Sequence, residues 1–157
     1  MKTSDAGIAL VKEFEHLELA PYYDAAGFPT VGYGHLLSRE RWADLSQWAV
    51  ITEEEADAFL LRKDLAVAES AVTRLVRIPL SHGQASALVS FTFNLGSGAL
   101  QASTLRRVLN RGEYHAVPAQ LRRWVFAGAR RLRGLARRRR AEIALGQPWI
   151  APYAEES

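Results

Sequence analysis

Apolar side chains recur every three residues near the start of the chain, which places them on one face of a helix. Ser4 or Asp5 can cap that helix, and Pro21 disfavours helical backbone at the residue before it. The pattern therefore predicts a helix over about residues 4–17. The apolar face consists of Ile8, Val11, Phe14 and Leu17.

The pattern changes between Tyr22 and Leu37. Aromatic and β-branched residues, which favour strands, alternate here with glycine and proline. We expect a small antiparallel hairpin or three short strands, and this is the only β region that the sequence predicts.

Helical spacing returns after residue 52. Thr52 followed by Glu55 is typical of a capping box, and it predicts a helix over about residues 53–77 that ends before Pro79. A helix from Ser81 or His82 to Gly96 is apolar on most sides, which is typical of an enclosed central helix. Shorter helices are expected over residues 103–110, 116–127 and 135–145.

These elements predict an α+β fold that is mostly α-helical. We expect one domain over residues 1–157. A small α/β lobe would cover about 15–52, a long connecting helix 53–77 and a helical lobe 80–150, with the helix 4–17 packing near that last lobe. A cleft between such lobes is a common place for a ligand.

Composition is ordinary for a globular protein, with 48% hydrophobic and 24% charged residues. The chain has no cysteine, so neither a disulfide nor a thiolate is available. Asp5 and Lys12 interrupt the N-terminus too early for a signal peptide, and no apolar run reaches the roughly 20 residues that span a bilayer. We therefore expect a soluble protein made without an export signal.

Charge is distributed unevenly. Residues 1–100 hold 8 Lys+Arg and 13 Asp+Glu, whereas residues 101–157 hold 12 and 4. The basic part suggests a polyanionic partner, and a solvated helix face is an equally good explanation. Seven arginines are concentrated in eleven residues: Arg130, Arg131, Arg133 and Arg137–Arg140.

Two carboxylates nine residues apart are candidates for acid–base chemistry. Glu15 falls on the apolar side of the first helix, where a carboxyl resists ionisation and can donate a proton, while Glu13 faces solvent. Asp24 lies in the turn-rich segment, where it stays solvated and ionised. Thr30 offers a hydroxyl that could hold a water beside Asp24. This division of roles is the one used in glycoside hydrolysis.

The segment from Glu15 to His35, EHLELAPYYDAAGFPTVGYGH, resembles the active-site signature of phage-type lysozymes, glycoside hydrolase family 24. That family has Glu, Asp and Thr at these spacings, followed by Ile/Val-Gly-x-Gly-His. Later segments are also similar, including FNLGSGALQASTLRRVLN from Phe93 and WVFAGARRLRGLARRRRAE from Trp124. The resemblance extends from Glu15 to Leu145. It departs at His16, where the family usually has glycine.

The resemblance implies a lysozyme-like two-lobe fold and an endolysin that cuts the β-1,4 bond between N-acetylmuramic acid and N-acetylglucosamine in peptidoglycan. We expect a monomer. It implies that Glu15 is the general acid of an inverting hydrolysis, in which Asp24 and Thr30 position water. Positions that contact sugar in the family correspond to Leu36, Phe93 and Asn94, and Arg137 corresponds to an arginine that pairs with the catalytic glutamate. A holin-type pore would release such a protein from the cytoplasm to the cell wall.

His35 is expected to support the site, either by bonding Asp24 or the strand backbone or by holding the hairpin. A lone histidine is poor evidence for a metal, so we expect neither a metal nor another cofactor.

Three alternatives remain open. A lytic transglycosylase would act on the same substrate, and a basic nucleic-acid binder would use the C-terminal charge. A membrane-disrupting helix within residues 122–145 could act beside hydrolysis or replace it, and the arginines could also contact anionic cell-envelope groups.

Overall fold

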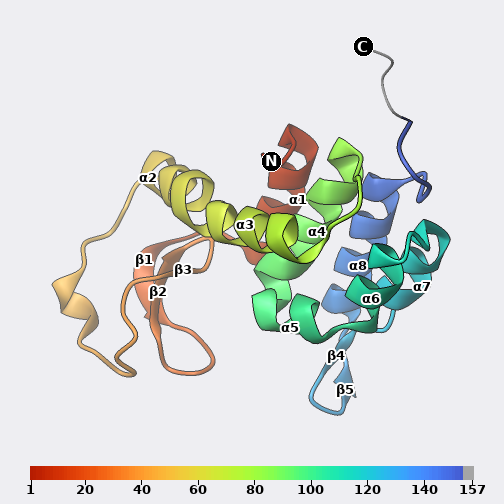
Figure 1. Cartoon of the computed structure of the whole chain (residues 1–157). Helices are drawn as coiled ribbons and strands as arrows, with labels where there is room; N and C mark the ends of the chain where they lie inside the picture. The colour runs from red at the N-terminus through yellow and green to blue at the C-terminus, as the bar shows by residue number, and fades with distance from the viewer. Residues whose placement is uncertain (154–157) are drawn as a thin grey trace. The chain divides into compact units, whose positions relative to one another are not determined.

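The computed structural model describes residues 1–153, and at Leu61 and Arg62 it describes the backbone alone. Helices dominate and the sheets are small and antiparallel, which confirms the predicted α+β, mostly helical class (Figure 1). The chain forms two compact units, Lys12–Ala66 and Met1–Val11 with Val67–Ser157. The predicted single domain and its lobe boundaries stay predictions.

Helix α1 (Asp5–Glu15) is the first predicted helix, and it buries Gly7, Leu10 and Val11. It ends two residues earlier than expected, because His16 adopts a left-handed backbone with φ 54°. That conformation breaks the helical hydrogen-bond ladder and directs the chain into a strand. Glu15 is therefore the last helical residue.

The unit Lys12–Ala66 contains a three-stranded antiparallel sheet in the order β1 (Glu18–Tyr23), β2 (Pro29–Gly32), β3 (His35–Leu36). This confirms the prediction of three short strands, although β1 starts four residues before Tyr22. All four residues of the central strand are buried. A Cβ on Gly32 would lie 3.3 Å from Cβ of Ala56, so β2 and helix α2 (Glu53–Phe59) pack closely.

Helix α2 continues through a π-helical segment η2 (Leu60–Asp64) into α3 (Leu65–Leu75). Both halves of the predicted capping box at Thr52 and Glu55 are present, which confirms where this helical run begins. A short 3₁₀ turn, η1 (Leu45–Gln47), precedes it. Lys12 Nζ lies 2.9 Å from Asp57, and this hydrogen bond raises the pKa of Lys12 and fastens the end of α1 to α2.

In the other unit, helix α4 (His82–Leu95) buries every residue from Gln84 to Thr92 and packs against α8 (Arg133–Gly146). The prediction of an enclosed central helix is confirmed. A second capping box, formed by Ser81 and Gln84, starts α4. The remaining elements of this unit are α5 (Ser97–Ala102), α6 (Thr104–Asn110), η3 (Tyr114–Ala116), α7 (Val117–Leu121), β4 (Phe126–Ala127) and β5 (Arg130–Arg131).

The predicted helix over residues 116–127 is wrong beyond Leu121. The chain instead forms a second hairpin, in which Phe126 pairs with Arg131 and Ala127 with Arg130, so the sequence's first β region is not the only one (Figure 1). A two-residue loop connects the strands, and Gly128 supplies its positive φ of 61° without steric cost. Of the segment 122–145, in which a membrane-disrupting helix was one of the alternatives, only the part from Arg133 onward is helical.

Among the residues that the structure describes, we find no helix with the length and apolar character needed to cross a membrane.

We expect His16→Gly to stabilise the protein by about 1 kcal/mol, because a left-handed non-glycine residue costs about 1–2 kcal/mol and glycine recovers part of this against its larger unfolded-state entropy. Urea unfolding measures the change. His16→Ala is the matched control and should bring no such gain, since alanine keeps the steric cost. A glycine variant that is less stable than the wild type would contradict this account.

Candidate active site

Glu15 projects from the end of α1 over the loop between β2 and β3. One carboxylate oxygen, Oε2, lies 3.6 Å from the position that a Cβ on Gly34 would occupy. Gly34 has φ +81°, which favours glycine, so it provides both the turn and the room for this carboxylate. Glu15 is half-buried whereas Glu13 is exposed, as the helical spacing predicted.

Asp24 lies directly after β1 and is fixed by its own turn. Its Oδ1 accepts hydrogen bonds from the backbone N–H groups of Ala26 and Phe28, both at 2.9 Å. The backbone N–H of Asp24 donates to the Phe28 carbonyl at 3.0 Å. The loop therefore binds Oδ1 of Asp24, and these two hydrogen bonds fix the orientation of the second carboxylate oxygen.

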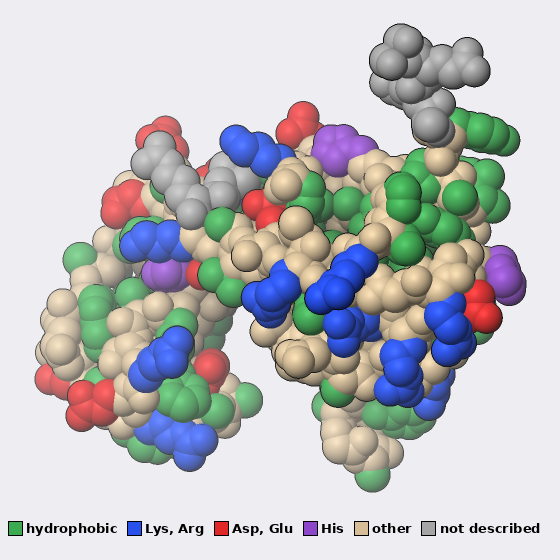
Figure 2. Space-filling view, in the orientation of Figure 1, with side chains coloured by type: hydrophobic (Ala, Val, Ile, Leu, Met, Phe, Trp, Pro, Cys, Tyr) green, Lys and Arg blue, Asp and Glu red, His purple; other side chains and the backbone are tan. Residues whose placement is uncertain are grey.

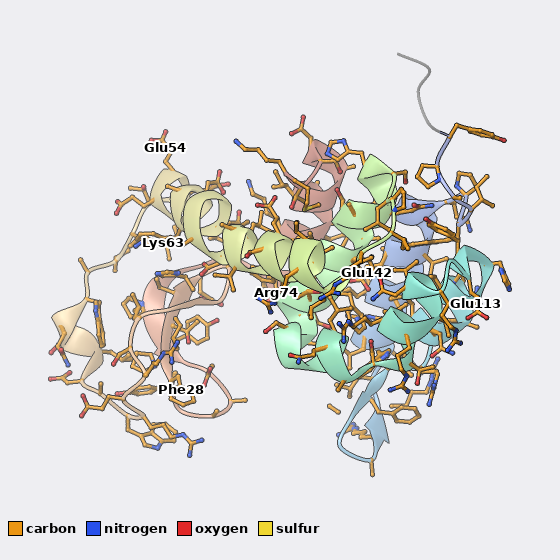
Figure 3. All side chains as sticks on the ribbon, viewed as in Figure 1. Phe28, Glu54, Lys63, Arg74, Glu113 and Glu142 are labelled. Atoms are coloured by element: carbon orange, nitrogen blue, oxygen red, sulfur yellow. The ribbon has the colours of Figure 1, made fainter. Side chains whose placement is uncertain are left out.

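Thr30 is buried in β2, with 4% of its surface exposed. Its hydroxyl donates to the Phe28 carbonyl at 2.8 Å. The backbone of Phe28 (labelled in Figure 3) thus bonds to both Asp24 and Thr30 and holds the two side chains in one place. Because its proton is already donated, the Thr30 oxygen faces any further partner as an acceptor.

Tyr22 was not among the residues that sequence reasoning predicted for the site, and it lies close enough to sense the predicted carboxylates. Burial raises the pKa of its phenol, and the negative charges of Glu18, Glu15 and Asp24 raise it further. Both predicted catalytic carboxylates therefore act electrostatically on the same side chain. Its position two residues before Asp24 could have pointed to the site. The preference of tyrosine for strands, however, was already enough to explain its presence there.

His35, on β3, supports the sheet through a partner that the sequence did not suggest. Its Nδ1 lies 2.9 Å from Asp64 Oδ2 in η2, and its ring stacks on Phe59 at 4.6 Å between ring centroids. Burial raises the pKa of Asp64, while the contact with His35 opposes that rise. Of the two roles expected for His35, bonding to Asp24 or the strand backbone is not the contact seen here, since its Nδ1 meets Asp64. The interpretation of His35 as a structural residue fits this geometry.

The three predicted sugar contacts fall in different units. Leu36 is 41% exposed and pairs across the sheet with Thr30, so it lies beside the site in the unit Lys12–Ala66. Phe93 and Asn94 are half-buried on α4 in the other unit. Asn94 Oδ1 accepts a hydrogen bond from the buried Arg139, which leaves the amide N–H₂ as the group that could meet a ligand.

The arginine run on α8 is only partly a surface feature. Arg138 and Arg139 are 3% and 0% exposed, and both lie against Glu142, which is also fully buried (labelled in Figure 3). Ser90 donates to Glu142 at 2.6 Å, and the Arg139 guanidinium lies 5.1 Å from the centre of the Phe91 ring. Burial raises the pKa of Glu142, whereas Arg139, Ser90 and Arg138 oppose that rise.

Arg137 precedes this buried pair and is exposed. It belongs to α8, in the unit that also carries Phe93 and Asn94. Two of the seven arginines that suggested a polyanion surface are therefore core residues. Their spacing matched helix-face charge well, and what distinguishes them is the contact of Arg138 with Ser90 and of Arg139 with Asn94 on helix α4.

The residues brought together in the unit Lys12–Ala66 can perform proton transfer and hold a water. Glu15 supplies a half-buried carboxyl, and Asp24 with Thr30 supplies two fixed acceptor oxygens. Across residues 1–153, the described side chains contain no group of three or more His, Asp and Glu residues placed to hold a metal ion. The arrangement fits acid-assisted hydrolysis by protein side chains.

Comparison with known proteins matches residues 12–142 to the family model described as phage lysozyme. The chain is 39% identical to the endolysin of Acyrthosiphon pisum secondary endosymbiont phage 1, over 92% of this chain and 97% of the relative. It is 37% identical to the endolysin of Bacillus phage B103 but spans only 54% of that protein. The muramidase domain of SpmX from Asticaccaulis excentricus superposes with a TM-score of 0.81 at 37% identity, covering 93% and 97% of the two chains.

Glu142→Gln should destabilise the protein by about 3 kcal/mol, because it removes a buried carboxylate that two buried guanidinium groups contact while keeping the side-chain volume. Urea unfolding followed by circular dichroism measures the loss. Glu113→Gln, at an exposed ion pair with Arg111, is the matched control and should change stability by less than about 1 kcal/mol. Equal losses in the two variants would contradict the assignment of Glu142 as the counter-charge of the core.

Proposed function

The chain belongs to the phage lysozyme family and is a lysozyme-type glycosidase, and from that premise we propose that it hydrolyses the β-1,4 bond between N-acetylmuramic acid and N-acetylglucosamine in peptidoglycan. Glu15 is the general acid that protonates the leaving sugar oxygen. Asp24 and Thr30 hold the water that attacks the anomeric carbon. The observation that carries the proposal is the backbone of Phe28, which binds Asp24 and Thr30 together.

The direction of the hydrogen bonds supports these roles. Asp24 is an acceptor as a carboxylate, and the Thr30 hydroxyl donates its hydrogen bond to the Phe28 carbonyl. A water between them donates both of its hydrogens, which leaves an oxygen lone pair directed at the sugar. As the new C–O bond forms, one water proton passes to Asp24, and Glu15 gives its own proton to the departing oxygen.

In this mechanism the reaction takes one step and inverts the anomeric configuration, as the resemblance implies. The runner-up is a lytic transglycosylase, in which a hydroxyl of the substrate replaces water and a 1,6-anhydro sugar forms. Two acceptors fixed around one position favour water as the nucleophile, because a transglycosylase has no use for a water site there.

The finer substrate contacts remain proposals. Leu36 and Phe93 would contact sugar faces, and the Asn94 amide would bond an acetamido oxygen. Arg137 stays a predicted supporting residue of the catalytic acid, as the resemblance implies. Loss of Arg137 with activity and pH profile unchanged would rule that role out.

We place the site of action at the bacterial cell wall, reached from the cytoplasm through a holin-type pore, and we propose that the protein acts as a monomer. Exposed arginines would then contact phosphate groups of the anionic envelope. Between Glu113 and Glu142 the sequence has nine arginines and no Asp or Glu. In Figure 2, Lys and Arg side chains gather over α6 and α7, in the unit formed by Met1–Val11 and Val67–Ser157. The exposed members of the segment include Arg122, Arg123, Arg130, Arg131, Arg133 and Arg140.

Glu15→Gln should reduce hydrolysis of purified peptidoglycan at least 100-fold, because the amide cannot donate the proton that the leaving group needs. Turbidity clearance and release of reducing ends measure the rate. Glu13→Gln, two residues earlier and exposed, is the matched control and should retain wild-type activity. Reducing-end products from the wild type support hydrolysis, and 1,6-anhydro products would instead establish the transglycosylase.

The double variant Arg130→Glu/Arg131→Glu should bind isolated envelopes several-fold more weakly at low salt. The difference should shrink at about 0.15 M salt, where the Debye length falls to about 8 Å. Co-sedimentation measures binding. Lys2→Glu/Arg74→Glu makes the same charge change at exposed positions outside this segment. Equal weakening in both double variants would show that net charge alone acts.

A further inference from the structure

We propose that Tyr22 is a further substrate-contacting residue of the active site, whose phenol donates a hydrogen bond to a sugar oxygen next to the scissile bond. The proposal rests on the proposed function, since it needs a glycan bound at Glu15, Asp24 and Thr30. Neither the spacing of the carboxylates nor the fold by itself assigns this role to Tyr22.

The strand register places Tyr22 on the side of the sheet that carries the water-holding hydroxyl. Tyr22 pairs directly with Thr30, and Thr30 pairs with Leu36 on its other side. Cross-strand partners project to the same face of an antiparallel sheet. Tyr22, Thr30 and Leu36 therefore form one row across the three strands.

The contacts of the neighbouring Tyr23 show which face of the sheet Tyr22 does not point to. Successive side chains of a strand point to opposite faces. Tyr23 donates its hydroxyl to the Ala43 carbonyl at 2.8 Å and meets the edge of Trp42 at 5.1 Å between ring centroids. Tyr23 thus packs into the sheet's other side, and Tyr22 is left facing the row that contains Thr30.

A β-bulge in β1 affects the direction in which the Tyr22 side chain points. Glu18 pairs with Gly32 and Tyr22 with Thr30, so three residues of β1 lie opposite the single residue Val31. Pro21 ends this bulge and lacks the N–H that a regular ladder would use. Bulges of this kind redirect a side chain and are common beside active sites.

The hydroxyl of Tyr22 is available to a ligand. Within residues 1–153, as far as their side chains are described, it makes no hydrogen bond, although the ring is half-buried. Burial and the charges of Glu18, Glu15 and Asp24 raise the pKa of the phenol, so it keeps its proton. Beside the carboxylates of Asp24 and Glu18, which accept hydrogen bonds, Tyr22 is thus a neutral donor, which a sugar hydroxyl or ring oxygen can use.

The test compares Tyr22→Phe with Tyr23→Phe, which remove the same atom from opposite faces of one strand. We expect Tyr22→Phe to lower kcat/KM on purified peptidoglycan roughly tenfold, the usual consequence of losing one hydrogen bond to the substrate, with its melting temperature unchanged. Tyr23→Phe should lower the melting temperature through loss of the bond to Ala43 and leave kcat/KM close to the wild type.

Wild-type kcat/KM in Tyr22→Phe would overturn the proposal, and so would an equal loss in both variants, because the effect would then belong to the sheet. Glu15→Gln separates this proposal from the function that it rests on. If Glu15→Gln is inactive and Tyr22→Phe is unchanged, only the role of Tyr22 fails. If Glu15→Gln keeps full activity, the proposed function itself fails.

Discussion

The active-site arrangement depends on a turn of backbone hydrogen bonds centred on Phe28. Its N–H donates a hydrogen bond to the Asp24 carboxylate. Its carbonyl accepts hydrogen bonds from the Thr30 hydroxyl and from the Asp24 N–H. Each bond is modest by itself, about 1 kcal/mol or somewhat more where a carboxylate accepts. Together they fix two side chains that are six residues apart, so that neither must be ordered when substrate arrives.

The other unit meets a different constraint, the burial of charge. Placing Arg138, Arg139 and Glu142 out of contact with water is costly. Their ion pairs with one another and their contacts with Ser90, Asn94 and the Phe91 ring offset part of that cost. Such a network tolerates little rearrangement, since any shift exposes an unmatched charge. It joins α4 to α8 and so defines how the two main helices of that unit pack.

Local features were the predictable part of this protein. The capping box at Thr52, the enclosed helix α4 and the three short strands all follow from patterns that span a few residues, and the structure has them. The candidate carboxylates followed from spacing and from resemblance, and their catalytic roles stay predictions.

What the sequence did not reveal depends on distant partners or on backbone geometry. Asp64 reaches His35 across 29 residues, and no local pattern selects it from other surface acids. Arg138 and Arg139 have the spacing of exposed charge, and their burial depends on Ser90 and Asn94, which lie 48 and 45 residues away in the sequence. The strands β4 and β5 have two residues each, too few for alternation to be visible, so helical spacing prevailed in the prediction.

The Phe28 turn also bears on how this position can vary in evolution. The site uses only the main chain of residue 28, while its ring lies under the Arg41 guanidinium at 5.1 Å, away from the bonds that matter. Changing the side chain at position 28 therefore leaves these hydrogen bonds in place, and many residue types are compatible with this position. Proline is the exception, because it lacks the amide hydrogen that Asp24 receives. If the proposed site is right, a comparison of related sequences would show many residue types at this position, with proline absent.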